Sequence, residues 1–433
     1  MASDGEIVAV VLIGGKEKLP AGGLEELGPW KVVTGTDQQE TLDDALLRFE
    51  PDSVIDLSDE PVLDYRRRHR LISVALARGV PYVGADFTFT PPPRPHVCER
   101  PSIAVIGTGK RTGKTAVAGF VARTLKEAGH PPVIVAMGRG GPPEPQVMRG
   151  DQIDLEAKDL LEIVEQGRHA ASDYIEDALL GRVPTVGCRR CGGGLAGAVA
   201  VSNVTEGVRI ANGLPGDAIV LEGSGSAIPP VHADASILVV PSSIPTEYLS
   251  SYMGPYRLLL SDFVVLTMCE EPFGSPSQIS AITSEIHSSF RTTKGEGSQP
   301  QIEIIRTVFR PAPTRSVEGR KVFVATTAPE AAGDSIESHL EEDHGCEVVG
   351  ITHALSDRDR LEKEIAEIAD KADTLLCEIK AAGIDVATKR AIDAGLDVVY
   401  MDNVPTSVDE EDAGAFVMRA YETAAERFDQ RDR

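Results

Sequence analysis

Apolar runs alternate with amphipathic stretches along most of the chain, and the pattern is clearest between residues 100 and 270. Strands that are buried on both faces of a sheet read as continuous apolar runs, and the stretches between them favour helices. The pattern therefore predicts an α/β fold with a central parallel sheet that carries helices on both faces. The expected strands of this central unit are residues 102–106, 132–136, 218–221, 236–240 and 263–267.

Shorter patterns of the same kind lie on both sides of the central unit. The first begins with an apolar run at residues 6–13, followed by expected helices near 41–49 and 61–78. A proline-rich stretch at residues 91–95 marks the first boundary. Beyond the central unit, apolar runs recur at residues 321–325, 347–351, 374–377 and 397–401. We expect a central domain over residues 98–312, flanked by two smaller Rossmann-like α/β domains over residues 1–97 and 313–433.

Composition and charge exclude several classes of protein. Lys and Arg number 43 against 67 Asp and Glu, which gives a formal net charge of −24. A field of this sign repels nucleic acid and anionic lipid, so neither is an expected partner. No run approaches the roughly 18 apolar residues of a membrane helix. No basic region precedes the first apolar run, so a signal peptide is not expected, and we expect a cytoplasmic protein with reduced cysteines.

A glycine-rich turn follows the first strand of the central unit and opens a helix over residues 116–128. Residues 107–115 read Gly-Thr-Gly-Lys-Arg-Thr-Gly-Lys-Thr. Glycines let backbone N–H groups surround phosphate oxygens, and the helix N-terminus adds the positive end of its dipole. The strict pattern has glycine where Thr108 stands, so an ordinary glycine-rich turn is the alternative. We expect a P-loop NTPase domain whose nucleotide-binding residues are Gly107, Gly109, Arg111, Thr112, Gly113, Lys114, Thr115 and Ala116.

The motif also predicts a magnesium site. In P-loop proteins the lysine, here Lys114, reaches the β- and γ-phosphates, and the hydroxyl of the next residue, Thr115, binds Mg²⁺. A second ligand is expected from a carboxylate at the end of a neighbouring strand, and Glu222 follows the apolar run 218–221. The alternative is a glutamate that only ends a strand. Residues 267–271 contain no Asn-Lys-x-Asp sequence to read guanine, which favours ATP over GTP.

Positive charge is concentrated around the predicted phosphate loop. Residues 107–150 contain seven Lys or Arg and two acidic residues, in a chain that is strongly acidic overall. Such a patch attracts an anionic substrate, so we expect a small phosphorylated molecule as the partner. The expected catalytic cations are Lys114, Arg139 and Lys110, and the expected substrate-binding residues are Arg139, Gly140, Gly141, Arg149, Arg189 and Arg190.

Three further stretches have two interpretations each. Residues 188–194 (Cys-Arg-Arg-Cys-Gly-Gly-Gly) are expected to form a glycine-rich loop that carries arginines to the phosphates, since a lone C-x-x-C is poor evidence for zinc. Asp151 or Asp154 could reach the metal through water, or cap the following helix. The basic run at residues 66–70 is either a solvated helix face or an anion-binding surface at a domain interface.

The motifs resemble those of a known family. Residues 107–115 and 222–225 resemble the dethiobiotin synthetase branch of P-loop proteins. Residues 137–145, 169–174 and 188–197 extend the resemblance to the cyclic 2,3-diphosphoglycerate synthetases of archaea, over nearly the whole chain. The resemblance implies an ATP- and Mg²⁺-dependent ligase that closes 2,3-diphosphoglycerate into its internal phosphoanhydride, giving ADP and phosphate as the other products.

Two other functions stay open at this point. A dethiobiotin-synthetase-like ligase or kinase would activate another small acid, but it would need a more neutral substrate pocket. A nucleotide-dependent switch or assembly protein would use its outer domains to bind a partner. The outer domains could equally close over the active site, carry substrate residues or build a homo-oligomer.

Overall fold

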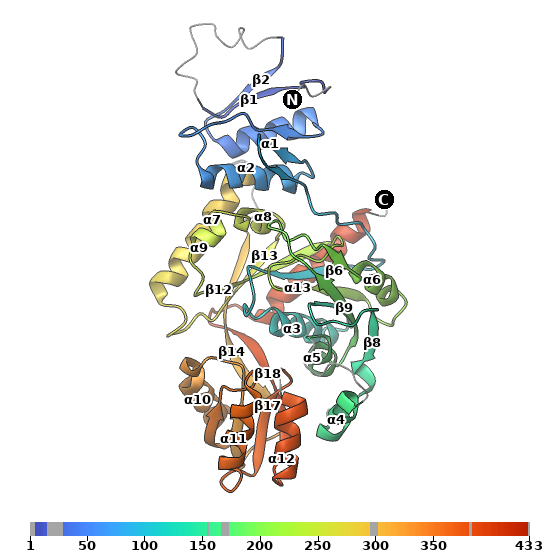
Figure 1. Cartoon of the computed structure of the whole chain (residues 1–433), viewed down its shortest axis with the longest axis vertical. Coiled ribbons are helices and arrows are strands. Elements are labelled where there is room, and N and C mark those ends of the chain that lie inside the picture. The colour runs from blue at the N-terminus through green and yellow to red at the C-terminus, as the bar shows by residue number, and fades with distance from the viewer. Residues whose placement is uncertain are drawn as a thin grey trace.

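The computed structural model describes residues 5–14, 29–153, 156–165, 173–294, 302–380 and 383–431. Three units follow one another along the long axis of the molecule, with the N-terminal unit at one end and the C-terminal unit at the other (Figure 1). Within the described ranges, no helix combines the length and the apolar character that a membrane crossing requires.

The N-terminal unit is built from two small sheets and two helices. Its elements are β1 (Val10–Leu12), β2 (Val32–Thr34), α1 (Gln38–Phe49), β3 (Val54–Ile55), α2 (Tyr65–Ala77), β4 (Tyr82–Val83) and β5 (Thr88–Phe89). The strand expected over residues 6–13 is shorter than predicted, because only its last part pairs with β2. The basic run on α2 joins this unit to the central one. Arg66 donates to Ser251 Oγ, Arg70 donates to the Ser250 carbonyl, and Arg68 pairs with Asp56 of its own unit.

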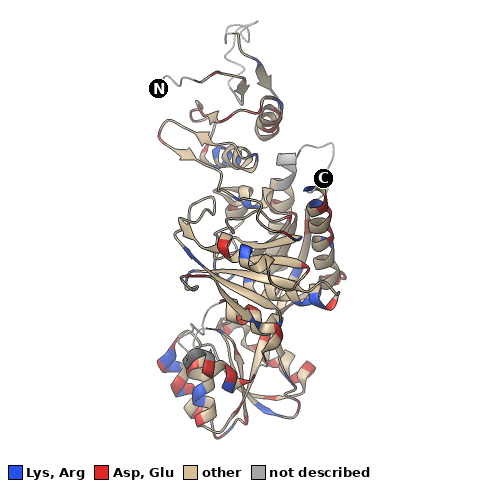
Figure 2. Cartoon of the chain, turned by 90° about the vertical axis from the view of Figure 1, so that its right-hand side faces the viewer, with Lys and Arg blue, Asp and Glu red and all other residues tan. Residues whose placement is uncertain are grey.

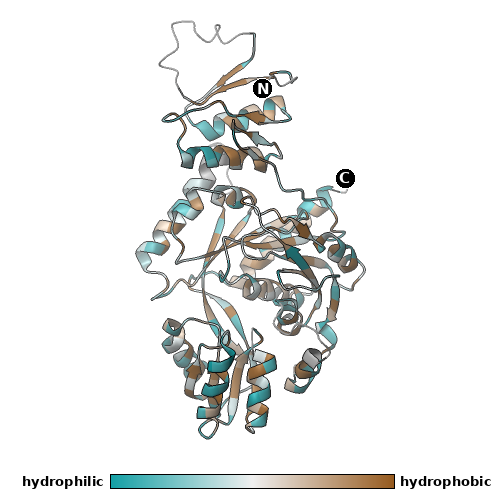
Figure 3. Cartoon of the chain, in the orientation of Figure 1, coloured by the Kyte–Doolittle hydropathy of each residue, from teal (hydrophilic) through white to brown (hydrophobic). Residues whose placement is uncertain are grey.

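The central unit contains the expected parallel sheet. All five apolar runs are strands: β6 (Ser102–Gly107), β7 (Pro132–Gly138), β11 (Ala218–Glu222), β12 (Ala235–Pro241) and β13 (Phe263–Thr267). Hydrophobic residues gather on these strands (Figure 3). Consecutive residues of β6 enter different cores: Ile103 and Val105 enter the core that includes α3, α5 and α13, and Ala104 and Ile106 enter the opposite one. Burial on both faces is why the runs are continuously apolar.

Helices cover both faces of this sheet. α3 (Lys114–Glu127), α5 (Asp173–Gly181) and α13 (Ala413–Arg431) pack on one face. The other face carries α6 (Val204–Asn212), α7 (Glu247–Ser250), α8 (Gly254–Leu259) and α9 (Pro276–Lys294). α4 (Ala157–Glu165) follows a short 3-10 helix at Gly150–Gln152.

Three strands of the central unit were not expected from the sequence. They are β8 (Gln146–Arg149), β9 (Pro184–Cys191) and β10 (Val201–Ser202). β9 pairs in parallel with β7, whereas β8 and β10 pair with β9 in the antiparallel sense. The expectation of a glycine-rich loop at Arg189 and Arg190 is therefore wrong, because both residues lie within β9. Proline, glycine and two arginines interrupt the apolar pattern of β9, so the sequence did not predict a strand there.

One sheet continues from the central unit into the C-terminal unit. In the described residues, 13 strands belong to it. The first half of β14 (Glu303–Pro313) pairs in parallel with β13, and its second half pairs antiparallel with β18 (Asp397–Ser407). The remaining elements are β15 (Lys321–Ala325), α10 (Gly333–His344), β16 (Glu347–Thr352), α11 (Arg358–Ile368), β17 (Thr374–Glu378) and α12 (Lys389–Asp393). The last helix, α13, leaves this unit and returns to the central sheet (Figure 1).

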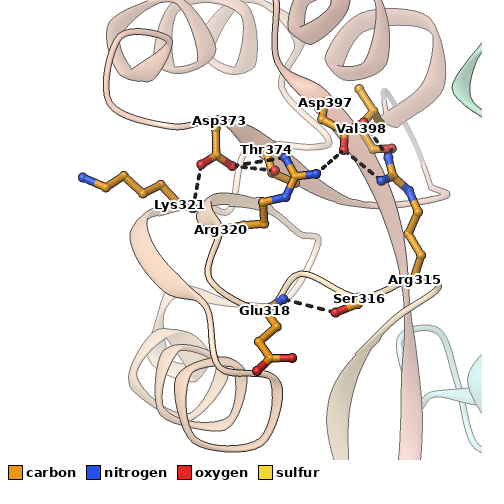
Figure 4. A network of polar contacts seen from close by, with 9 residues as sticks. All are labelled: Arg315, Ser316, Glu318, Arg320, Lys321, Asp373, Thr374, Asp397 and Val398. Atoms are coloured by element: carbon orange, nitrogen blue, oxygen red, sulfur yellow. Dashed lines mark hydrogen bonds and ion pairs between the residues drawn. The ribbon is translucent and has the colours of Figure 1, made fainter.

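Ion pairs lie at the edge of the sheet where the strands β17 and β18 of the C-terminal unit begin (Figure 4). Arg315 forms a two-pronged contact with the Asp397 carboxylate, with N–O distances of 2.8 and 2.5 Å. Arg320 lies 3.6 Å from Asp397 and 3.9 Å from Asp373. Acidic and basic residues also alternate along the helices of this unit (Figure 2). The opposite, carboxyl-terminal edge of the sheet is the one that meets the central unit.

Candidate active site

The predicted phosphate loop lies between β6 and α3, as the sequence suggested. Gly113 has a φ of +94°, and a Cβ at that position would approach the Phe309 ring to 2.2 Å, so only glycine fits. No side chain caps the N-terminus of α3, which leaves its first backbone N–H groups available to an anion. Lys114 Nζ donates to the Gly109 carbonyl at 2.6 Å, so the ammonium group lies across the loop.

The loop is also tied to the neighbouring strands. Thr267, at the end of β13, donates its hydroxyl proton to the Thr112 carbonyl at 2.9 Å. Lys114 is buried, and this burial lowers the pKa of its ammonium group, against the charge of Glu222, which raises it. A buried cation at the centre of the loop is suited to an anionic ligand, which would replace the hydration that the lysine lacks.

Thr115 and Glu222 lie together, as expected. Thr115 Oγ1 donates a hydrogen bond to Glu222 Oε1 at 2.6 Å. β11 pairs in parallel with β6, and Glu222 stands opposite Val105, so the sheet register brings the carboxylate beside the loop. Burial and then the charge of Asp173 raise the pKa of Glu222, and the hydrogen bond from Thr115 lowers it, which leaves a pKa of about 7. The carboxyl group of Glu222 also shares a hydrogen bond with Asp177, and no basic, amide or hydroxyl group among the described residues donates to its buried second oxygen, Oε2.

An acidic face of α5 completes this side of the site; sequence reasoning pointed to residues 169–174, which include Asp173, but missed Glu176 and Asp177. Asp173, Glu176 and Asp177 have the i, i+3, i+4 spacing that places side chains on one helix face. Asp177 is 1% exposed, and its carboxyl group interacts with that of Glu222. Burial, followed by the charge of Glu222, raises the pKa of Asp177 well above its usual range. Acidic residues at this spacing within an otherwise apolar helix were the available signal.

Basic side chains converge on the carboxyl ends of the same strands. A Cβ at Gly225 would lie 3.3 Å from Arg190 Nη2 and 3.7 Å from Lys110 Cγ, so both cations flank this glycine. Arg190 is 4% exposed and donates to the Ser224 carbonyl at 2.8 Å. Its burial lowers the pKa of its guanidinium, and the charge of nearby Arg139 lowers it further. Arg190 Nε has no hydrogen-bond partner.

Arg189 occupies a different position from its neighbour. Successive side chains of a strand point to opposite faces, and Arg189 donates through Nε to the Gly141 carbonyl. Its backbone N–H donates to Asn203 Oδ1 at 2.7 Å. Arg189 therefore holds the Arg139-Gly140-Gly141 turn against β9, and that turn carries Arg139 to the site.

Arg149 does not join the cluster, which corrects the expectation for this residue. β8 runs antiparallel to β9, so Arg149 pairs with Pro184, at the end of β9 opposite Arg189. The offset along the strand is about 16 Å. Arg149 is instead bound to Asp151, with an Nε–Oδ1 distance of 2.8 Å. This pairing also occupies Asp151, and Asp154 and residues 169–172 lie outside the described residues.

The two cysteines of the C-x-x-C sequence do not form a metal site. Cys188 is buried and Cys191 is exposed, and burial raises the pKa of Cys188 to about 12. Across the part of the chain that the structure describes, no three His, Cys, Asp or Glu side chains are arranged to hold a metal ion. A magnesium site differs, because Mg²⁺ takes one or two carboxylates and completes its shell with phosphate oxygens and water.

The C-terminal unit reaches this site through a network of charges. Lys380, just after β17, lies with its Nζ 2.9 Å from Glu176 Oε1. Arg123 of α3 pairs with Asp402 of β18 at 2.5 Å. Glu378 accepts hydrogen bonds from Thr326, Thr327 and Asn403. Burial acts to raise the pKa of Glu378, but the charge of Lys380 and these hydrogen bonds outweigh it and lower the pKa.

Comparison with known proteins agrees with this arrangement. Three family profiles match the chain, described as the N-terminal domain (residues 1–90), the P-loop domain (102–307) and the C-terminal domain (313–404) of cyclic 2,3-diphosphoglycerate synthetase.

Curated relatives that carry this name match over almost the whole length. The protein of Methanothermus fervidus is 45% identical over 94% of this chain and 88% of its own length. That of Rubrobacter xylanophilus is 46% identical over 92% of this chain and 88% of its own length. Among solved structures, the ATP complex of LpxK from Aquifex aeolicus covers 88% of this chain and 99% of its own, with a TM-score of 0.45 and 13% identity. With three matching domains and relatives of this identity, the chain belongs to the cyclic 2,3-diphosphoglycerate synthetase family.

Proposed function

We propose that this protein is an ATP-dependent ligase that closes 2,3-diphosphoglycerate into cyclic 2,3-diphosphoglycerate, with ADP and phosphate as the other products. The observation that carries the proposal is the convergence of four cations around the phosphate loop, beside Thr115 and Glu222. These cations are Lys110, Lys114, Arg139 and Arg190. The family relationship supports this choice of substrate among small phosphorylated acids.

ATP is the nucleotide that we propose for the phosphate loop. The uncapped N-terminus of α3 and the backbone N–H groups of residues 107–116 would hold the phosphates, with Lys114 beside the β- and γ-groups. Thr115 and Glu222 fit a magnesium ion, because the buried carboxyl group of Glu222 lies beside the hydroxyl and its Oε2 receives no hydrogen bond from a basic, amide or hydroxyl group of the described residues. When bound there, Mg²⁺ would neutralise charge on the transferring phosphoryl group.

The remaining cations are assigned to 2,3-diphosphoglycerate. Its two phosphates repel each other, so bringing them within bonding distance requires fixed positive charge around both. Arg190 and Arg139 would hold one or both phosphates, with the backbone of Gly140 and Gly141 beside them, and Lys110 would face the transferring group. Arg189 would keep the Arg139 turn in place through its contact with Gly141.

The proposed reaction needs little acid–base catalysis from the protein. The γ-phosphoryl group of ATP passes to one substrate phosphate, and an oxygen of the neighbouring phosphate then displaces inorganic phosphate to close the ring. Both substrate phosphates are ionised near neutral pH, so the attacking oxygens need no general base. The residues therefore act through position and charge, which is the usual basis of phosphoryl transfer.

The proposal is tested by measuring ADP release by the purified protein with ATP and Mg²⁺. We expect release to depend on 2,3-diphosphoglycerate and to stop in stoichiometric proportion to it. ADP release at the same rate with and without this substrate, or an equal increase with unphosphorylated acids, would contradict the proposal.

A further inference from the structure

Asp177 is a buried acidic side chain that the proposed reaction leaves without a role. It is 1% exposed, and among the described residues no basic, amide or hydroxyl group donates to its oxygens; its carboxyl group instead shares a hydrogen bond with that of Glu222. Two carboxyl groups in contact inside a protein destabilise the folded state when both are ionised, and buried charges are usually paired with an opposite charge. Its presence in the middle of α5 therefore requires an explanation.

The surroundings of Asp177 are acidic rather than basic. The charges that act on it most strongly are those of Glu222, Glu176 and Asp173. Glu176 is paired with Lys380, whereas the carboxyl groups of Asp177 and Glu222 are in contact with each other. Two buried carboxyl groups thus share one hydrogen bond next to the hydroxyl of Thr115.

We propose that Asp177 is a second carboxylate of the magnesium site, which it shares with Glu222 and Thr115. This inference rests on the proposed function, which brings Mg²⁺ to this place. Divalent cations of this kind prefer carboxylate and hydroxyl oxygens, and one or two carboxylates beside the nucleotide phosphates are usual for Mg²⁺. The ion would supply the positive charge that the folded chain lacks around Asp177.

The test is the Asp177→Asn variant, studied by Mn²⁺ binding in electron paramagnetic resonance and by thermal unfolding with EDTA or Mg²⁺. We expect the affinity for Mn²⁺ to fall at least about tenfold. The metal-free variant should melt at the same or a higher temperature than the unaltered protein, because an amide can donate to Glu222 without placing a second acidic group against it. Stabilisation by added Mg²⁺ should be largely lost.

Asp217→Asn is the matched control. Asp217 is an exposed aspartate just before the other end of β11, the strand that carries Glu222. We expect its affinity for Mn²⁺ to stay within about twofold of the unaltered protein. A purely structural role for Asp177 gives a different pattern: a lower melting temperature without metal and an unchanged affinity for Mn²⁺. That result would overturn the proposal.

A second variant keeps the test decisive if Asp177→Asn folds poorly. Asp177→Cys replaces a hard oxygen ligand by a thiol, which favours Cd²⁺ over Mg²⁺ when the side chain contacts the ion. We expect this variant to release ADP faster with Cd²⁺ than with Mg²⁺. Equally slow ADP release with both ions would count against direct contact between this side chain and the metal. If the unaltered protein forms the cyclic product and Asp177→Asn still binds Mn²⁺ normally, only this inference fails; absence of product from the unaltered protein would instead refute the proposed function.

Discussion

Thr115 donates its hydroxyl proton to Glu222 at a distance of 2.6 Å, although 107 residues separate the two in sequence. The parallel pairing of β6 with β11 produces this contact, because it brings the ends of both strands to one edge of the sheet. The phosphate loop, the metal-binding candidates and the basic cluster all lie at that edge, which is where open α/β sheets bind their ligands.

Replacing Lys114 by alanine should reduce the rate of ring closure by about 100- to 1,000-fold, because its charge is placed for the transferring phosphoryl group. The comparison is Lys126→Ala on the same helix, whose exposed ammonium group donates to the Arg182 carbonyl. Rates of product formation and melting temperatures should be measured for both. Comparable rates for the two variants would contradict the role of Lys114.

Arg190→Met and Arg149→Met distinguish the two ends of β9. Loss of Arg190 should raise the KM for 2,3-diphosphoglycerate at least about tenfold, since a charge-assisted contact to a phosphate is removed. Arg149 lies at the other end of the strand, bound to Asp151, so its loss should change the KM less than about twofold. Steady-state kinetics at saturating ATP provide the measurement. An equal effect of both substitutions would argue against a substrate site around Arg190.

The raised pKa of Glu222 predicts opposite effects of pH on stability and on metal binding. Its pKa of about 7 in the folded state exceeds the ordinary value of a glutamate, so the folded protein binds more protons than the unfolded chain between about pH 4.5 and 7. The melting temperature in EDTA should therefore fall as the pH rises through this window, and Glu222→Gln should flatten the dependence.

Metal affinity should change in the other direction. A proton on Glu222 competes with the ion, so the affinity for Mn²⁺ should fall by up to about tenfold for each pH unit below 7. Titrations at pH 6 and pH 8 provide the comparison. An affinity that is constant across this range would show that Glu222 does not bind the ion as a carboxylate.

Lys380 and Glu176 connect the C-terminal unit to α5, and loss of this ion pair should destabilise the folded protein. Lys380→Met leaves Glu176 buried without its partner, which should lower the free energy of unfolding by about 3 kcal/mol. The double variant with Glu176→Gln should recover much of this loss. Lys363→Met, an exposed residue on α11, should change stability by less than about 0.5 kcal/mol. Urea unfolding of the unaltered protein, Lys380→Met, Glu176→Gln and the double variant gives the coupling energy, and additive effects of the two substitutions would exclude a direct interaction.

Local sequence was enough to place the phosphate loop and Glu222. A continuous apolar run identifies a doubly covered strand, and its last residue must lie at the carboxyl edge of a parallel sheet. The same reasoning fails for β9, where glycine, proline and arginine break the pattern, so Arg189 and Arg190 were assigned to a loop. It also fails for Arg149, because only the antiparallel pairing of β8 shows which way that residue faces.

Other features depend on contacts that no local pattern encodes. Asp177 resembles a solvated helix residue until α5 is packed on the sheet over β7 and β9, where its carboxyl group meets that of Glu222. α13 follows the C-terminal unit in sequence but packs on the central sheet, where Arg427 donates to the Asp234 carbonyl and to Asp262. The approach of Lys380 to Glu176 likewise follows from the pairing of β14 with β18, which joins the central and C-terminal parts of the sheet.

The most direct test of the proposed reaction is ³¹P NMR of the purified protein with ATP, Mg²⁺ and 2,3-diphosphoglycerate. The account predicts a new upfield phosphoanhydride signal from the cyclic product, together with equal amounts of ADP and inorganic phosphate. ATP that remains intact, or that is hydrolysed while the 2,3-diphosphoglycerate signals stay unchanged, would contradict it.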